Sequence, residues 1–284
     1  MQRMTSQEIH QELFEALCEI DRICKKNNIP YWLGFGSLLG AARHEGFIPW
    51  DDDMDLWMMR EDWDRFNKIV SQELKEKYYA INQYTRKNYP AWSLVSRVSI
   101  KGTYRHHSYF KDKKEYKSGI YIDIFPLENI SQRKMLQKIQ QKLLGKIDEI
   151  LICKTQTKES SLEILGRKYY FGRIPASFMT VYKWNQLRSI LQKGFGKKDS
   201  RYVMVPMGPR GKYPLEKILY KREYFGRTKA LNFCAYHEEE RKNFPAPGQY
   251  EKILRRTYCD WKRIQKKKKE KDFTANCTKT AEQL

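Results

Sequence analysis

The densest group of side chains that could do chemistry is the acidic run Asp51-Asp52-Asp53-Met54-Asp55. Four carboxylates within five positions repel one another strongly, and a cation placed among them relieves that repulsion. Asp53 and Asp55 are two residues apart, so on a β-strand their side chains point to the same face. Carboxylate oxygens suit Mg²⁺ or Mn²⁺, and no histidine or cysteine adjoins the run to favour zinc. Taken alone, the run also fits a solvated acidic turn before a strand.

A Gly36-Ser37 pair precedes this run by fourteen residues. The local pattern predicts a short strand at residues 31–33, helical turns at 37–43 and a second strand at 54–59. A glycine at such a turn lets a ligand approach the backbone closely, and the N–H groups that open a helix bind phosphate. The order strand, Gly-Ser, short helix, strand with Asp-x-Asp resembles the nucleotidyltransferase fold related to DNA polymerase β. In that fold the Gly-Ser turn holds a phosphate, which is the role expected here of Gly36 and Ser37.

Three blocks of sequence narrow this resemblance. The stretch FGSLLGAARHEGFIPWDDDMDL at residues 35–56 resembles the signature of the LicD family, which includes bacterial phosphorylcholine transferases and the fukutin-related proteins. The block GIYIDIFPL at 119–127 is similar to the family's next motif, a strand that carries an acidic residue before Phe-Pro. FPAPGQY at 244–250 and YCDW at 258–261 resemble its C-terminal block, with Cys259 in place of an expected glycine. The resemblance covers residues 10–261.

The resemblance implies a reaction and a cofactor. LicD-like enzymes move a phosphorylated alcohol from a CDP-activated donor to a sugar hydroxyl of a cell-surface glycan, lipopolysaccharide or teichoic-acid precursor. Carried over to this sequence, Asp53, Asp55 and Asp123 would be the catalytic and metal-binding residues, and Mg²⁺ (or Mn²⁺) the cofactor. The metal would neutralise the diphosphate of CDP-choline or a related CDP-alcohol and stabilise charge on the departing CMP. Asp123 could also take the hydroxyl proton as a general base.

Two arginines are candidate contacts for the donor diphosphate. Arg43 lies inside the first block and Arg97 follows the apolar run LVSRV. Arginine is a good bidentate partner for phosphate, although either residue could instead neutralise the acidic run. Asp51 and Asp52 are expected to shape the turn or to support the metal ligands.

The remaining sequence predicts the elements that position these residues. The expected fold class is α/β (α+β), with a nucleotidyltransferase-like mixed sheet flanked by helices and a mainly helical C-terminal portion. Apolar periodicity and β-rich composition predict helices at 5–28, 60–77, 131–157, 179–194 and 248–263, and strands at 91–100 and 119–127. Thr5 and Glu8 predict a capping box at the start of the first helix. The expected organisation is a catalytic core at 1–128, a helical portion completing the cleft at 129–261, and a disordered basic tail at 262–284.

Composition restricts the class of protein and its partners. The 284 residues include 55 Lys and Arg against 34 Asp and Glu, a net charge of +21, and 40% are hydrophobic, which argues against wholesale disorder. No window of about 18 apolar residues predicts a membrane span, and the N-terminus lacks the features of a signal peptide, so the expected location is the cytoplasm. Seven of the eleven residues at 262–272 are Lys or Arg. This run fits either peripheral contact with the anionic inner face of a membrane or a solubilising tail.

Two alternative functions share these features. An NTP-dependent nucleotidyltransferase would use the same metal geometry, so the aspartates alone do not exclude it. A polyanion- or RNA-binding module with a degenerate site would fit the charge. The basic residues are spread along the chain without an RNA-recognition motif, and Asp53, Asp55 and Asp123 are all present. A CDP-activated donor and a glycan or lipid-linked glycan acceptor are therefore the expected partners, in preference to nucleic acid.

Overall fold

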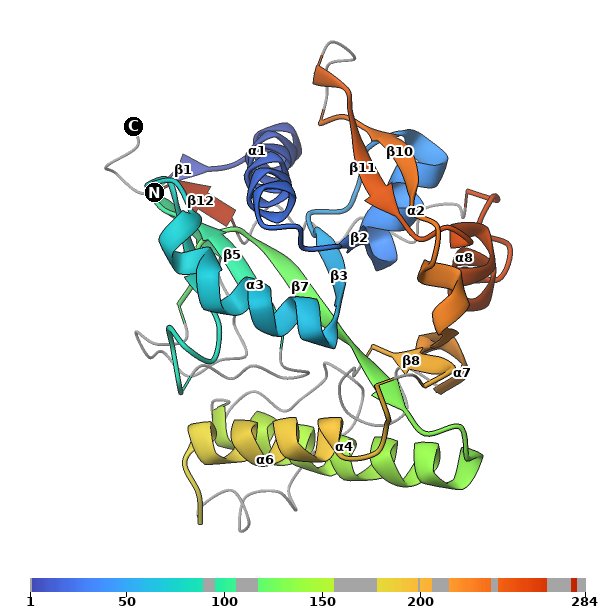
Figure 1. Cartoon of the computed structure of the whole chain (residues 1–284). Helices are drawn as coiled ribbons and strands as arrows, with labels where there is room; N and C mark the ends of the chain where they lie inside the picture. The colour runs from blue at the N-terminus through green and yellow to red at the C-terminus, as the bar shows by residue number, and fades with distance from the viewer. Residues whose placement is uncertain are drawn as a thin grey trace.

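One mixed sheet organises the molecule (Figure 1). The computed structural model describes residues 2–88, 95–105, 117–155, 178–198, 200–205, 215–235, 240–264 and 277–279. The strand order is β2-β3-β7-β5-β4, with β8 on the far part of β7 and β9 on β8. β3 and β7 are parallel, and the other pairs are antiparallel. The expected mixed α/β class is confirmed. The strands are β2 (Trp32–Leu33), β3 (Asp55–Met59), β4 (Tyr78–Ile81), β5 (Ser96–Ile100), β7 (Tyr121–Ile130), β8 (Tyr202–Met204) and β9 (Leu219–Lys221).

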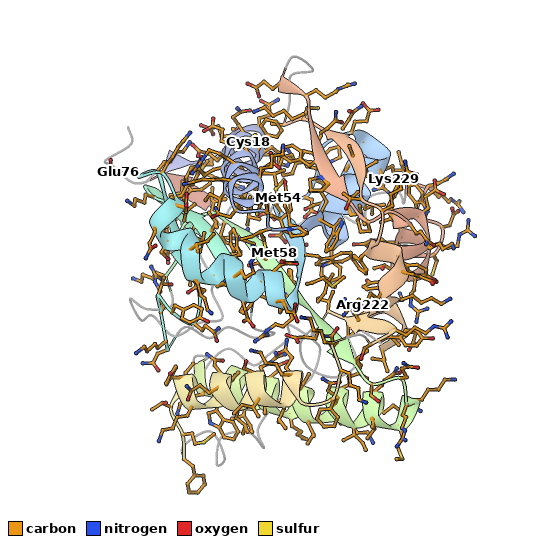
Figure 2. All side chains as sticks on the ribbon, in the orientation of Figure 1. Cys18, Met54, Met58, Glu76, Arg222 and Lys229 are labelled. Carbon is orange, nitrogen blue, oxygen red and sulfur yellow. The ribbon has the colours of Figure 1, made fainter. Side chains whose placement is uncertain are left out.

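Helices α1 (Ser6–Lys26) and α3 (Arg60–Glu73) pack on this sheet. The predicted capping box starts α1: the Thr5 hydroxyl accepts the Glu8 N–H, and the Glu8 carboxylate accepts the Thr5 N–H. Side chains spaced three and four residues apart form the apolar face of α1 and are fully buried, namely Ile9, Leu13, Leu17, Ile20 and Ile23. Met54, directly before β3, and Met58, within β3, both lie in the interior (Figure 2). The two helices therefore hold in place the sheet into which the acidic run leads.

Helix α2 (Phe35–His44) connects β2 to β3 and is covered by C-terminal segments. A hairpin of β10 (Lys229–Phe233) and β11 (Lys242–Ala246) packs beside it, as does α8 (Tyr250–Tyr258). The loop that follows α2 packs back on the helix at Gly40, where an added Cβ would lie 2.4 Å from the carbonyl oxygen of Gly46. Between β8 and the hairpin lie two short helices, α7 (Leu215–Ile218) and η4 (Arg222–Phe225).

A helical layer extends from the far end of β7. Helices α4 (Lys134–Thr155) and α6 (Val181–Lys193) lie side by side at one end of the molecule (Figure 1). Buried charges join this layer internally and to the sheet: Arg188 is bonded to Asp148 at 2.6 and 3.0 Å, and Gln192 donates to Glu128 of β7 at 2.7 Å. Residue 128, expected to end the catalytic core, falls within β7, which serves both the core and the helical portion.

The C-terminal segment differs in part from the expected disordered tail. Strand β12 (Cys277–Lys279) pairs with β1 (Gln2–Arg3) and with β6 (Thr103–Arg105), and so bridges two short strand edges that would otherwise be open. Most of the basic run, residues 265–272, lies outside the described residues. Among the helices that are described, none combines the length and the apolar character needed to cross a membrane.

Candidate active site

Three adjacent strands bring two of the predicted carboxylates and one predicted arginine together. Asp55 of β3 lies opposite Asp123 of β7, and Asp123 lies opposite Arg97 of β5. Residues opposite one another in neighbouring strands project to the same face of a sheet. The Arg97 Nε donates to the Asp123 Oδ1 at 2.6 Å, and its guanidinium lies 3.9 Å from the centre of the Tyr121 ring. The structure therefore gives Arg97 a carboxylate partner inside the cluster.

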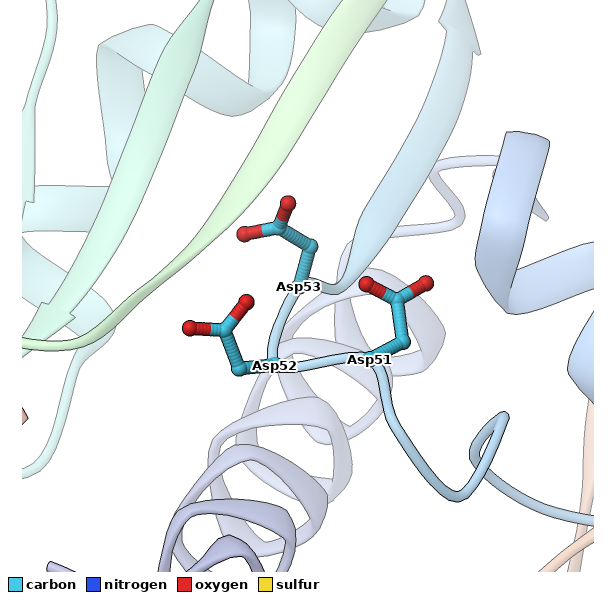
Figure 3. A group of neighbouring side chains, drawn as sticks. All are labelled: Asp51, Asp52 and Asp53. Carbon is cyan, nitrogen blue, oxygen red and sulfur yellow. The ribbon is translucent and has the colours of Figure 1, made fainter. Parts of the chain in front are cut away.

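A second group of carboxylates lies on the loop that enters β3 (Figure 3). Asp51, Asp52 and Asp53 each place a carboxylate oxygen within 4.8 Å of the others. Asp52 is buried, whereas the side chain of Asp53 is 54% exposed. Asp53 is thus the member that an incoming ligand can reach most readily. The closest acidic triad among the described residues contains Asp53 but is otherwise different from the predicted set of Asp53, Asp55 and Asp123.

Arg105 is the counter-ion of this loop. Its Nη2 donates to the Asp53 Oδ1 at 2.7 Å and lies 3.4 Å from the Asp52 Oδ1, and its Nη1 donates to the Asp52 carbonyl oxygen at 3.3 Å. The guanidinium also lies 5.1 Å from the centre of the Tyr121 ring. The sequence analysis did not identify Arg105. No local motif marks it, because only the tertiary fold brings β6, which belongs to a separate sheet with β12 and β1, to this loop.

Burial and mutual repulsion raise the pKa of several of these carboxyl groups. Burial, then the charges of Asp53 and Asp52, raise the pKa of Asp51 from 3.8 to about 7. Burial raises the pKa of Asp55 well above its usual value, and Asp53, Asp123 and Asp51 add to this effect. The pKa values of Asp52 and Asp123 are also raised by burial, against the opposing effects of Arg105 and Arg97 respectively. Burial is the main cause of these raised pKa values, and nearby carboxylates add to it.

The Gly-Ser turn is joined directly to the start of β3. The Ser37 hydroxyl accepts the backbone N–H of Asp55 at 2.8 Å, and the Gly34 N–H donates to the Asp55 carbonyl at 2.9 Å. A Cβ added at Gly36 would lie 2.9 Å from the Asp51 Oδ2, so a larger residue here would displace the Asp51 carboxylate. Phe35 has φ 37°, an unfavourable value for a bulky residue, and its ring packs edge-on against aromatic rings of β3 and β7. The first turn of α2, which is the positive end of the helix, is held beside the acidic loop.

The opposite side of the loop is held by helix α1. The His10 Nε2 lies 2.6 Å from the Asp51 carbonyl oxygen, and the His10 ring stacks on Phe47 with the centroids 4.2 Å apart. Burial lowers the pKa of His10, so the neutral ring can donate this hydrogen bond through Nε2–H. The acidic loop is therefore positioned by contacts from α1 and α2 in addition to its own strand.

Arg43 is not brought to the carboxylates. It lies in the last turn of α2, where its Nε donates to the His44 Nε2 at 3.0 Å and its Nη1 donates to the Trp261 carbonyl at 3.4 Å. Burial lowers the pKa of Arg43. Its contacts join the first sequence block to the C-terminal block, and the expected phosphate contact of Arg43 stays a prediction.

The donor set fits a hard divalent cation. Asp51, Asp53, Asp55 and Asp123 provide oxygens only, and Asp53 is open to solvent. The charge of Asp53 adds to the effect of burial in raising the pKa values of the other three. A dication near this cluster would offset the repulsion that the two arginines leave. Carboxylates that hold a dication beside an arginine pair and a helix N-terminus form a setting suited to a diphosphate ligand.

Comparison with known proteins finds a family match that includes the elements of this site. Residues 28–143 match the family model described as LicD/FKTN/FKRP, nucleotidyltransferase domain. Over 270 residues the chain is 26% identical to the lipopolysaccharide cholinephosphotransferase LicD of Haemophilus influenzae, a match that covers 93% of this chain and 94% of that relative. A 34-residue segment is 62% identical to ribitol 5-phosphate transferase FKRP of human and of mouse, covering 12% of this chain and 7% of each relative. The Gly-Ser turn, the acidic loop and Asp123 all lie within residues 28–143.

Proposed function

Because residues 28–143 form a domain of the LicD family, as the sequence blocks predicted, we propose that this chain is a phosphotransferase that modifies a glycan. More specifically, the chain would transfer a phosphorylated alcohol from a CDP-activated donor to a sugar hydroxyl of a lipopolysaccharide or other surface-glycan precursor. The observation that carries it is the pairing of Asp55 with Asp123 beside the acidic loop, within the matched domain. CDP-choline is the first donor to test, since the relative matched over almost its full length is a cholinephosphotransferase.

The proposed reaction breaks the phosphoanhydride bond of the CDP-activated donor and forms a phosphoester bond to the acceptor. The acceptor oxygen attacks the phosphorus that carries the alcohol, the bond from that phosphorus to the CMP oxygen breaks, and CMP leaves with the bonding electron pair. The acceptor proton passes to a carboxylate. Asp123 is the proposed general base, because burial raises its pKa and so makes it a better proton acceptor than an exposed aspartate. The bond from Arg97 opposes this shift and holds the carboxylate in place.

Asp53, Asp55 and Asp123 are the proposed ligands of Mg²⁺ or Mn²⁺, with Asp51 and Asp52 supporting them. When bound, the metal would supply Lewis-acid neutralisation of the diphosphate oxygens. Asp53 meets the ligand at the solvent side, as its exposure allows.

Two groups on the other side of the loop are proposed to position the donor phosphates. The N-terminal turn of α2 directs backbone N–H groups and the positive end of its dipole toward the loop. The Ser37 hydroxyl already accepts the Asp55 N–H, so its own hydrogen stays available to an acceptor. We propose that Ser37 donates this hydrogen to a phosphate oxygen of the donor, while its bond to Asp55 keeps the turn in place against β3.

Calorimetric titration of CDP-choline tests this function. We expect binding in the presence of Mg²⁺ that is lost in EDTA and lost in the variant Asp53→Asn/Asp55→Asn. CDP-ribitol and CTP are titrated in parallel, and release of CMP in the presence of a glycan acceptor is the activity assay. The matched control is Glu61→Gln/Glu216→Gln, which removes two exposed acids outside the cluster and should bind normally.

The outcomes separate the alternatives. Metal-dependent binding of CDP-choline or CDP-ribitol supports the transferase and identifies the alcohol. Binding of CTP with release of pyrophosphate would replace the proposal with a nucleotidyltransferase. If no CDP-alcohol binds with metal present, the proposed donor is wrong.

A further inference from the structure

The exposed apolar side chains of this protein are concentrated on the helical layer. Nine large hydrophobic side chains are exposed among the described residues, and six of them lie on or beside α4 and α6. Met135, Ile139 and Leu143 are spaced four residues apart, so they form one stripe along α4. Met135 is 69% exposed and Ile190 of α6 is 67% exposed. A clustered exposed apolar surface on a soluble fold marks an interaction site.

A row of lysines runs beside the stripe. Lys134, Lys138, Lys142 and Lys146 repeat every four residues and are all exposed. Twelve residues of helix give the row a length of about 18 Å at 1.5 Å per residue. Together with the stripe they make a basic–apolar face, which consists of Lys134, Met135, Lys138, Ile139, Lys142, Leu143 and Lys146.

Little negative charge neutralises this face. Lys146 pairs with Glu149 at 2.9 Å, whereas no ion-pair partner of Lys134, Lys138 or Lys142 lies in the part of the chain that the structure describes. The other acid of α4, Asp148, is fully buried and bonded to Arg188. Helix α6 contains no acidic residue. The face is thus cationic from Lys134 to Lys142, and its charge is partly neutralised at Lys146.

The opposite side of α4 is firmly attached to the molecule. Leu144, Ile147 and Leu151 are buried, and Gln140 donates to the Gln192 carbonyl at 2.9 Å. Side chains project from this layer away from the sheet (Figure 2). The basic–apolar face is therefore presented by a supported helix.

We propose that the basic–apolar face of α4 docks on an anionic lipid surface. The headgroups of such a surface attract the lysines, while the boundary between headgroups and acyl chains accepts the three apolar side chains. A nucleic acid would interact favourably with the lysines and leave the apolar stripe in water. A lipid interface can contact the lysine row and the apolar stripe at the same time, so it is the partner that fits the whole face. This contact is distinct from the basic run at 262–272 and does not depend on the proposed reaction.

Vesicle co-sedimentation of the full chain tests the proposal. The vesicles contain phosphatidylcholine with or without phosphatidylglycerol, at about 0.1 M salt. Replacing Lys134, Lys138, Lys142 and Lys146 with Gln should lower partitioning onto anionic vesicles at least tenfold, since each lysine near such a surface accounts for roughly a fivefold change. The variant Met135→Ser/Ile139→Ser/Leu143→Ser should also lower it at least tenfold, with the lysines intact.

Two control variants match the change in charge. One replaces four exposed lysines elsewhere with Gln, namely Lys25, Lys68, Lys229 and Lys252. The other replaces Lys266, Lys267, Lys268 and Lys269 of the basic tail. Both should change partitioning less than threefold. All substituted α4 side chains are exposed, so circular dichroism and thermal melting should match those of the parent.

Each other result overturns the proposal. Equal losses in the α4 set and the exposed control set would mean that net charge alone drives binding. Loss confined to the tail variant would place the membrane contact at residues 262–272. Absence of vesicle binding would overturn it as well, and a concentration-dependent dimer abolished by the serine variant would then assign the stripe to a second copy of the chain.

Discussion

Replacement of Asp51 by asparagine should stabilise the metal-free protein at alkaline pH. The pKa of Asp51 is raised from 3.8 to about 7 by burial and by Asp53 and Asp52. For an acid whose pKa is raised by folding, the folded state binds more protons, so stability falls as pH rises between the two values. At about 1.36 kcal/mol for each pH unit, the shift amounts to roughly 4 kcal/mol. Asparagine keeps the shape of the side chain and removes the charge.

The difference between Asp51→Asn and the parent therefore has a defined pH profile. Below about pH 3 the two proteins should have nearly equal free energies of unfolding, because Asp51 is then protonated in both states. The variant should gain stability between pH 4 and 7 and be more stable by about 2–4 kcal/mol at pH 8, the upper figure being the full shift.

Urea unfolding followed by circular dichroism, in buffers containing EDTA, measures this profile. Glu61→Gln, at an exposed position of α3, is the matched control and should show no such gain. Repeating the series with Mg²⁺ should shrink the advantage of the variant, because a dication stabilises the parent's ionised cluster. A variant that is no more stable than the parent at pH 8, or a difference that does not depend on pH, would refute the reasoning that Asp51 is an unfavourably buried charge.

Three further predictions address other parts of the structure. Arg188→Met should lower the free energy of unfolding by about 3–5 kcal/mol in urea titrations, because it leaves the buried Asp148 without its partner; a loss below 1 kcal/mol would contradict this. Gly40→Ala should destabilise the protein by about 1–3 kcal/mol despite alanine's better helix propensity, since its Cβ would meet the Gly46 carbonyl at 2.4 Å; a raised melting temperature would show that the backbone relaxes freely. Arg105→Gln should tighten Mn²⁺ binding about tenfold, measured by electron paramagnetic resonance, because it removes the cation that pairs with Asp53; weaker binding would mean that Arg105 organises the site and does not compete with the metal.

Local sequence signals predicted the elements around the site well. The apolar period of α1 and its Thr5–Glu8 cap gave both the helix and its start, because both signals act within a few residues. The apolar run around Asp55 and the β-rich composition around Asp123 likewise predicted β3 and β7. The resemblance to the LicD family then indicated that these two strands belong to one site.

Those local signals did not predict which distant segments of the chain pair with one another. Nothing near Arg105 indicates that β6 will bring it to Asp53, or that β12 will pair with β6 from the other end of the chain. The closest acidic triad is also set by the turn into β3, whose geometry depends on contacts from α1 and α2. Arg43 is a related case. Its place in a family-like block suggested a phosphate contact, but the block did not determine that its side chain lies against the Trp261 carbonyl.

The parallel register of β3 and β7 also bears on how the protein folds. Asp55 and Asp123 are neighbours in space but 68 residues apart in the chain, and parallel pairing of distant segments carries a large loop-closure cost. During synthesis the acidic loop leaves the ribosome well before its partner strand. The carboxylates thus come together only when this late contact closes, and their repulsion opposes that step. A divalent cation bound at this stage would offset that repulsion and favour the closure, so the metal of the proposed function would also assist folding.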